Sequence, residues 1–165
     1  MSADRGETNE AAHHERWMGE ALEEADRAAE EGEVPVGAVL VRGDRILARA
    51  HNLREATGDP TAHAEVLALV AGSREVGNWR LDECDLYVTL EPCAMCAGAL
   101  VNARVRTLVF GTSDPKGGYC GSLGDIVRDS RLTHRVHVIS GVRAEECAQV
   151  LRRFFARLRD APSGP

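Results

Sequence analysis

Two short motifs carry residues whose types and spacing could form a catalytic metal site. The first motif contains His63 and Glu65, and the second contains Cys93 and Cys96, which follow Pro92. Imidazole and thiolate are zinc ligands, and a zinc ion with only three protein ligands keeps one position open for water. The sequence therefore predicts a zinc cofactor, one ion per chain, held by His63, Cys93 and Cys96.

Glu65 lies beside the predicted ligands and could move protons. Zinc lowers the pKa of a bound water toward about 7 and so supplies hydroxide at neutral pH. A partly buried carboxylate can take the water proton and return it to a leaving amine. We expect Glu65 to be the catalytic proton carrier. A C-x-x-C pair alone would equally fit structural zinc or a redox pair, but the upstream His-x-Glu favours a catalytic metal.

Composition and charge narrow the class of protein. The chain has 165 residues and no apolar run near the roughly 20 residues of a membrane helix, which excludes a membrane span, and its polar N-terminus lacks a signal peptide. We therefore expect a cytoplasmic protein.

The net charge is −6, but the segment 128–159 holds eight arginines and three acidic residues. This basic segment would suit a polyanion, or it is simply a solvated helix face.

Hydrophobic periodicity indicates an α/β domain. We expect a disordered acidic leader over residues 1–12, one domain over 13–160 and a flexible tail over 161–165. Strands that alternate with helices predict a central sheet covered on both faces, and an initial hairpin makes this five-stranded sheet mixed. The expected helices span 14–31, 61–72, 92–102 and 144–158, and the expected strands span 34–41, 46–52, 84–90, 105–111 and 136–139.

Both motifs together form H-x-E…P-C-x-x-C, the signature of zinc-dependent deaminases. Beyond it, the chain resembles the bacterial tRNA-specific adenosine deaminases from about Trp17 to Arg159. The resemblance implies a three-layer αβα, cytidine-deaminase-like fold and a homodimer. It also implies conversion of adenosine to inosine at the wobble position (34) of a tRNA anticodon, with an arginine tRNA as the expected partner. The matching segments include 33–39, 59–65, 87–99, 109–111, 121–123 and 133–136.

The resemblance also implies substrate-binding roles for residues outside the zinc motif. Asn52 would hydrogen-bond the flipped purine, and the backbone N–H of Ala64 would contact the base or the water. Asp114 would contact ribose or backbone, and the helix with Phe154 and Phe155 would lie near the anticodon loop. These roles agree with chemistry, because an amide side chain offers the paired donor and acceptor that adenine needs. A single-stranded loop also makes extrusion of the base cheap.

Two alternatives stay open from the sequence. One is a small-molecule deaminase of the same fold that acts on guanine, cytosine or a nucleoside. The other is a zinc-binding scaffold without activity. The zinc motif does not separate the first alternative, but the basic C-terminal helix and the loop at Asp114 favour a polymeric substrate. Glu65 argues against the scaffold, because a structural zinc site has no use for a proton carrier.

Overall fold

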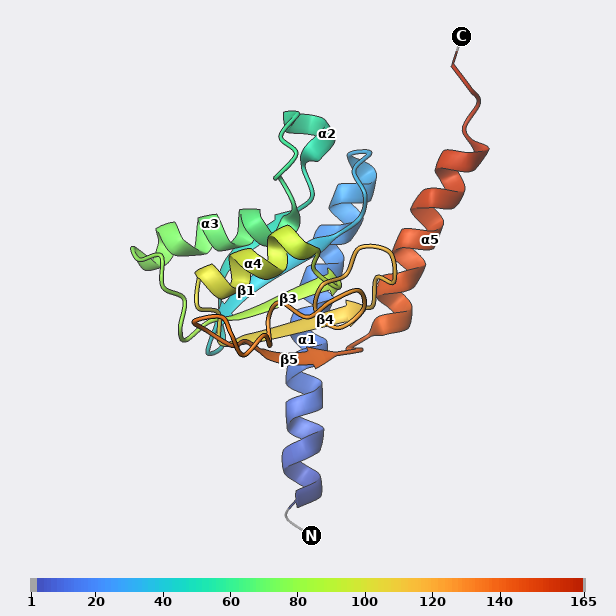
Figure 1. Cartoon of the computed structure of the whole chain (residues 1–165). Helices are drawn as coiled ribbons and strands as arrows, with labels where there is room; N and C mark the ends of the chain where they lie inside the picture. The colour runs from blue at the N-terminus through green and yellow to red at the C-terminus, as the bar shows by residue number, and fades with distance from the viewer. Residues whose placement is uncertain (1–2, 165) are drawn as a thin grey trace.

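The computed structural model describes residues 3–164, in which a mixed five-stranded sheet lies between two layers of helices (Figure 1). The strands are ordered β2-β1-β3-β4-β5; β1 is antiparallel to β2 and β3, while β3, β4 and β5 are parallel. This confirms the expected mixed sheet. The helices are α1 (Ala3–Glu30), α2 (Arg54–Thr57), α3 (Ala64–Val76), α4 (Ala94–Asn102) and α5 (Ala144–Asp160), and the strands are β1 (Gly37–Arg42), β2 (Arg45–His51), β3 (Asp85–Leu90), β4 (Thr107–Thr112) and β5 (His137–Ser140).

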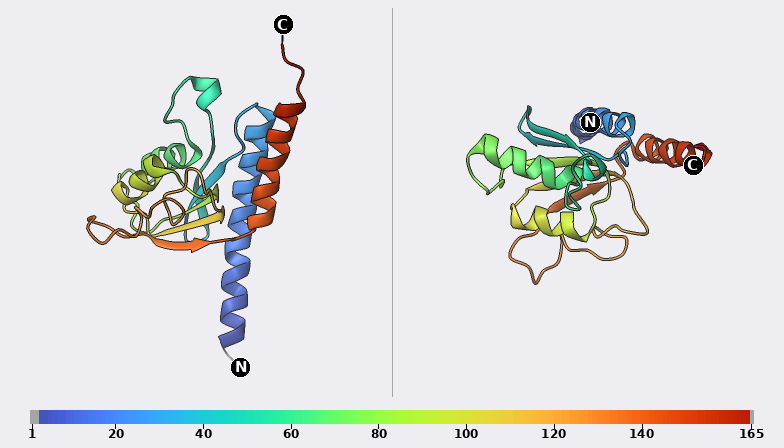
Figure 2. Two further views of the ribbon diagram at one scale, coloured as in Figure 1. Left: turned by 45° about the vertical axis from the view of Figure 1, so that its right-hand side comes forward. Right: turned by 90° about the horizontal axis from the view of Figure 1, so that it is seen from above.

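Alternate residues of the central strands bury against opposite helix layers. Side chains at successive strand positions point to opposite faces, so each strand can serve both layers. The view from above shows α3 and α4 on one face of the sheet and α1 and α5 on the other (Figure 2). The α3–α4 side buries Leu40, Leu86, Val88, Leu108 and Phe110, and the α1–α5 side buries Val39, Val41, Tyr87 and Val109.

The N-terminal leader is helical, which corrects the expected disorder over residues 1–12. Helix α1 begins at Ala3 (Met1 and Ser2 lie outside the described residues), and its first turns project beyond the body of the molecule, with residues 6–12 exposed (Figure 2). The helix is anchored further on, where Trp17 and Met18 are buried. Once this part of the helix is fixed, adding a further helical residue has a low free-energy cost. No proline interrupts the leader, which contains several Ala and Glu residues.

Helix α3 also differs from the prediction at its two ends. The helix was expected to end near Gly72, but it continues to Val76. Gly72 is a packing position rather than a helix end: a Cβ there would collide with the side chain of Leu40, so the glycine permits close packing. Gly77, with φ of 75°, ends the helix. At the start of the helix His63, rather than Thr61, is the N-cap residue.

Among the described residues, no helix is long and apolar enough to cross a membrane.

His51, at the end of β2, fastens this strand to the C-terminal part of α1. Its Nδ1 lies 2.8 Å from Glu24 Oε2 and its Nε2 lies 2.9 Å from Glu31 Oε2. Arg27 also donates to Glu24, at 2.6 Å. Burial lowers the pKa of His51, but the hydrogen bonds to Glu24 and Glu31 outweigh burial, so the net shift of this pKa is upward. The doubly protonated ring can donate to both carboxylates.

We expect the free energy of unfolding to fall as the pH rises through the folded-state pKa of His51. Because this pKa is above the unfolded value of 6.5, the stabilisation is fully present below that pH and disappears as the ring deprotonates. Urea unfolding of the wild-type protein and His51→Gln, measured from about pH 6 to about pH 9, should give curves that converge at high pH. A difference between the two proteins that is constant with pH would contradict this account.

Candidate active site

The predicted zinc ligands lie at the starts of two neighbouring helices on one face of the sheet. His63 is the N-cap residue of α3, Cys93 is the N-cap residue of α4, and Cys96 lies in the first turn of α4. Helix α4 begins at Ala94, two residues later than the expected start at Pro92. Backbone N–H groups at a helix start carry partial positive charge, which favours thiolate.

The three ligand atoms are spaced as a tetrahedral zinc ion requires. His63 Nδ1 lies 3.6 Å from Cys93 Sγ and 3.5 Å from Cys96 Sγ. Zn–N and Zn–S bonds of tetrahedral sites imply a separation of roughly 3.6 Å between a nitrogen and a sulfur ligand. All three atoms lie within 4.8 Å of one another. The residues present therefore fit zinc, and Nδ1 is the ring nitrogen that faces the site.

The two cysteines differ in their affinity for protons. Hydrogen bonding from the Cys96 thiol and from the backbone N–H groups of Cys96 and Met95 lowers the pKa of Cys93 to about 5, although burial opposes this shift. The hydrogen bond to Cys93, together with burial, raises the pKa of Cys96. Zinc binds cysteine as thiolate, so metal binding at this pair would release the proton of any thiol that is protonated beforehand.

Glu65 faces the same site from the first turn of α3. Its side chain is only 4% exposed, and burial raises the pKa of its carboxyl group, although hydrogen bonding with the Cys96 thiol opposes the shift. On a regular helix, two side chains that are two positions apart point away from each other. His63, however, has the extended backbone of an N-cap residue, with φ of −80° and ψ of 149°. Both side chains can therefore face one pocket.

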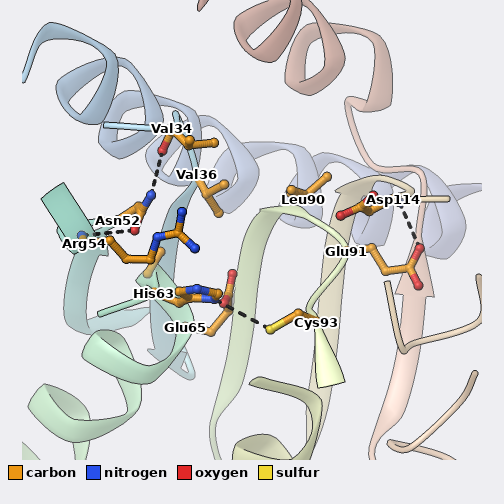
Figure 3. Close-up of a pocket in the computed structure, with 11 residues that line it drawn as sticks. Val34, Val36, Asn52, Arg54, His63, Glu65, Leu90, Glu91, Cys93 and Asp114 are labelled. Carbon is orange, nitrogen blue, oxygen red and sulfur yellow. Dashed lines mark hydrogen bonds between the residues drawn. The ribbon is translucent and has the colours of Figure 1, made fainter. Parts of the chain in front are cut away.

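This pocket has a volume of about 150 Å³ and gathers most of the residues singled out from the sequence (Figure 3). His63 and Cys93 form part of its wall with Glu65. Of the five predicted substrate-binding residues, the pocket brings together three: Asn52 from the segment after β2, Ala64 from the first turn of α3, and Asp114 from the loop after β4. The pocket is lined by Val34, Val36, Asn52, Arg54, His63, Ala64, Glu65, Leu90, Glu91, Cys93 and Asp114.

Asn52 lies on the pocket wall, and its side-chain amide forms two hydrogen bonds with the protein backbone. It is buried, its Nδ2 donates to the carbonyl oxygen of Val34 at 3.4 Å, and its Oδ1 accepts the backbone N–H of Arg54 at 3.3 Å. Both bonds are long, and an amide has two N–H donors and two acceptor lone pairs. The side chain thus keeps capacity for a ligand while the protein fixes its orientation.

Asp114 enters the pocket from the loop after β4. Its Oδ1 accepts the backbone N–H groups of Lys116 and Gly117, at 3.0 and 3.1 Å. Its own backbone N–H donates to Glu91 Oε1 at 3.0 Å. The loop is therefore held in a fixed shape, and its place in the pocket wall is compatible with contact to a sugar.

Phe154 and Phe155 do not line this pocket. Phe154 is buried beside α1, whereas Phe155 is 43% exposed, and their rings are 5.4 Å apart in an edge-to-face arrangement. Neighbours on a helix point about 100° apart, so one ring packs inward while the other remains outside. In this structure these two residues are separate from the cluster formed by His63, Cys93 and Cys96.

Two buried glutamates near the pocket were missed by the sequence reasoning. Glu91 accepts the backbone N–H groups of Asp114, Cys120 and Ser122 at 3.0–3.1 Å, and also the Ser122 hydroxyl. Burial raises the pKa of Glu91, but these hydrogen bonds outweigh it and lower the pKa overall. Glu33 accepts two N–H groups of α2. In the sequence, each of these glutamates stands next to an apolar residue of an expected strand, in Glu33-Val34 and Leu90-Glu91, and this placement could have indicated a buried carboxylate.

Comparisons with known proteins agree with this geometry. A model of the MafB19-like deaminases matches residues 12–159. The tRNA-specific adenosine deaminase of Bacillus subtilis (strain 168) is 52% identical over 145 residues, which are 88% of this chain and 90% of that protein.

Solved structures confirm the expected deaminase fold. One, from a study of A-to-I editing by tRNA:A34 deaminases, has a TM-score of 0.80 and 43% identity over 82% of this chain and 99% of its own. A guanine deaminase from Nitrosomonas europaea has a TM-score of 0.76 over 86% of this chain and 84% of its own, but its 23% identity shows the fold alone. The chain therefore belongs to the MafB19-like deaminase family and, within it, to the tRNA-specific adenosine deaminases.

Proposed function

We propose that this protein is a hydrolase that converts adenosine to inosine at position 34, the wobble position, of a tRNA anticodon. The observation that carries the proposal is the cluster of His63, Cys93 and Cys96 beside buried Glu65 in a pocket that also contains Asn52. The relatives named as tRNA-specific adenosine deaminases support the same substrate class.

The chain's own residues supply binding and proton transfer. Asn52 offers an amide to the purine edge, and the N–H of Ala64 lies on the pocket wall beside it. Zinc held by His63, Cys93 and Cys96 would activate a water molecule for attack on the carbon that bears the amino group. Glu65 accepts a proton from this water as its oxygen bonds to the carbon, and delivers that proton to the ring nitrogen. It then takes the remaining proton of the attached hydroxyl and passes it to the amino group, so that the C=O bond forms as the C–N bond breaks. Adenosine and water thus give inosine and ammonia.

The pocket favours a base that is already unstacked. A base inside a duplex cannot reach the metal cluster, so the nucleotide must leave its stack, and a single-stranded anticodon loop lowers the cost. Asp114, on the pocket wall next to this position, is suited to contact the ribose. The proposal therefore names an anticodon stem-loop as the minimal substrate.

Three further parts of the proposal extend the sequence analysis: the first two rest on the family resemblance, and the third rests on composition. We propose a homodimer as the working form, an arginine tRNA as the partner and the cytoplasm as the location. Light scattering of the purified protein tests the dimer, and turnover of a set of anticodon stem-loops tests the choice of tRNA. A monomer with full activity would contradict the first part.

The decisive experiment compares substrates side by side. Zinc-loaded protein is incubated with an arginine anticodon stem-loop, free adenosine, guanine and cytosine, and the products are separated by chromatography. We expect inosine in the stem-loop and no turnover of the small molecules. Turnover of guanine or cytosine without turnover of the stem-loop would replace this proposal by the small-molecule alternative.

The two neighbouring phenylalanines should behave differently on substitution. Phe154→Ala removes a buried ring and is expected to cost about 3–5 kcal/mol of unfolding free energy. Phe155→Ala removes an exposed ring, so we expect the melting temperature to stay nearly unchanged while KM for the stem-loop rises. The rise is expected because an unpaired base stacked on an aromatic ring is stabilised by about 1–3 kcal/mol. An unchanged KM would remove Phe155 from the RNA surface.

A further inference from the structure

Arg54 extends a positive charge over the mouth of the pocket. Figure 3 shows its side chain reaching from α2 over the ring of His63, and both residues line the pocket. Its backbone N–H is bound to Asn52 Oδ1 at 3.3 Å. Among the described residues, however, the Arg54 guanidinium forms no ion pair and no hydrogen bond. A cation therefore lies at the pocket with no partner in the part of the chain that the structure describes.

The acidic groups in the pocket wall are committed elsewhere. Asp114 holds two N–H groups of its own loop, and Glu91 holds four donors of the segment from Asp114 to Ser122. Glu65 is buried beneath the opening, next to the metal ligands. The charge of Arg54 is thus available to a ligand that enters the pocket. A planar guanidinium is well suited to phosphate oxygens, which it can bind through two parallel hydrogen bonds.

Glu33 determines where Arg54 lies. Helix α2 has only four residues, and its N-cap residue, Leu53, provides no side-chain cap. The Glu33 carboxylate takes over this role from outside the helix: one oxygen accepts the N–H of Glu55 at 3.1 Å and the other accepts that of Ala56 at 2.7 Å. Glu33 is fully buried, and so short a helix does not persist without such support.

We propose that Arg54 binds a backbone phosphate of the RNA next to the target nucleotide, and that Glu33 is the positioning residue that holds Arg54 in place. This inference rests on the proposed function, because it assigns the phosphate to an RNA substrate. It explains how the pocket distinguishes a nucleotide within a chain from a free nucleoside. The free nucleoside has the same base but lacks the flanking phosphate.

The first test compares Arg54→Gln with Arg42→Gln in zinc-loaded protein. Arg42 is exposed at the far end of β1, so its substitution removes the same charge away from the pocket. For Arg54→Gln we expect KM for the stem-loop to rise about tenfold or more, with kcat changed by less than about twofold, because a charge-assisted hydrogen bond is lost in ground and transition states alike. The slope of log affinity against log salt should become shallower by about 0.7.

The second test asks whether Glu33 acts through Arg54. Glu33→Gln leaves one acceptor oxygen and places an amide N–H₂ against a backbone donor, so α2 should loosen. We expect KM to rise in this variant while zinc content stays at one per chain. In the double variant Glu33→Gln/Arg54→Gln, KM should nearly equal that of Arg54→Gln alone, since residues that act as a unit are not additive. Independent, additive effects, or loss of zinc, would overturn the positioning role.

Binding measurements separate this inference from the proposed function. If the wild-type protein forms no inosine in the stem-loop, the proposed function fails. Fluorescence anisotropy of a labelled stem-loop still tests Arg54 in that case, and equal affinity of wild type and Arg54→Gln overturns the phosphate assignment. Adenosine 5′-monophosphate is the comparison ligand. If Arg54→Gln weakens its binding as much as that of the stem-loop, Arg54 recognises a mononucleotide, and the RNA assignment is wrong.

Discussion

Replacement of Glu65 by glutamine is expected to lower kcat for the stem-loop by about 10²–10⁴-fold, the range that general acid–base catalysis contributes. Glutamine has nearly the same size but cannot carry the proton between water, ring nitrogen and departing amine. Because Glu65 is buried in the first turn of α3, an isosteric change should leave the packing intact. Single-turnover kinetics, together with zinc analysis and circular dichroism, would measure the effect.

Glu75→Gln is the matched control for this prediction. Glu75 lies on the same helix but is exposed, and it pairs with Arg45 at 2.5 Å. Exposed ion pairs contribute about 0–1 kcal/mol, so activity and stability should remain close to those of the wild type. Loss of zinc from Glu65→Gln would identify Glu65 as a ligand, and unchanged turnover would exclude it as the proton carrier.

Metal removal is expected to have the second large effect, because the ligands join the starts of α3 and α4. A ligand bound only by the folded state stabilises it by about 4 kcal/mol when its concentration is a thousandfold above Kd. For a chain of this size, each kcal/mol corresponds to about 2–4 °C in Tm. Treatment with a chelator should therefore abolish turnover and lower Tm by about 8–16 °C, and added zinc should restore both.

Substitutions of cysteine localise the metal effect. Cys93→Ser should prevent stoichiometric zinc binding and reproduce the chelator-treated state. Cys84→Ser changes a buried cysteine just before β3, outside the cluster of ligands, and should keep one zinc per chain. The zinc assignment is wrong if metal-free protein retains full turnover, or if Cys93→Ser binds zinc as the wild type does.

The grouping of His63, Cys93 and Cys96 and the order of the elements were predictable from the sequence. Ligand chemistry depends on residue type and local spacing, and His63, Cys93 and Cys96 carry both in the printed chain. Mostly apolar, β-branched runs such as 34–41 likewise predicted buried strands, because a strand with helices on both faces of its sheet buries successive side chains. The extension of α1 over residues 3–12 was missed, since a polar segment can continue an anchored helix without burying anything itself.

Only the tertiary structure decided which residues surround the metal cluster. Glu33 supports a helix more than twenty residues away, and Glu91 fastens the loop from Asp114 to Ser122. These hydrogen bonds depend on how distant segments meet, and no periodicity or local motif encodes that meeting. The same applies to Phe154 and Phe155, which the fold keeps outside the pocket. Local chemistry thus predicted a metal site and a candidate proton carrier. Long-range packing set the shape of the pocket and, among the described residues, left the Arg54 guanidinium without a partner.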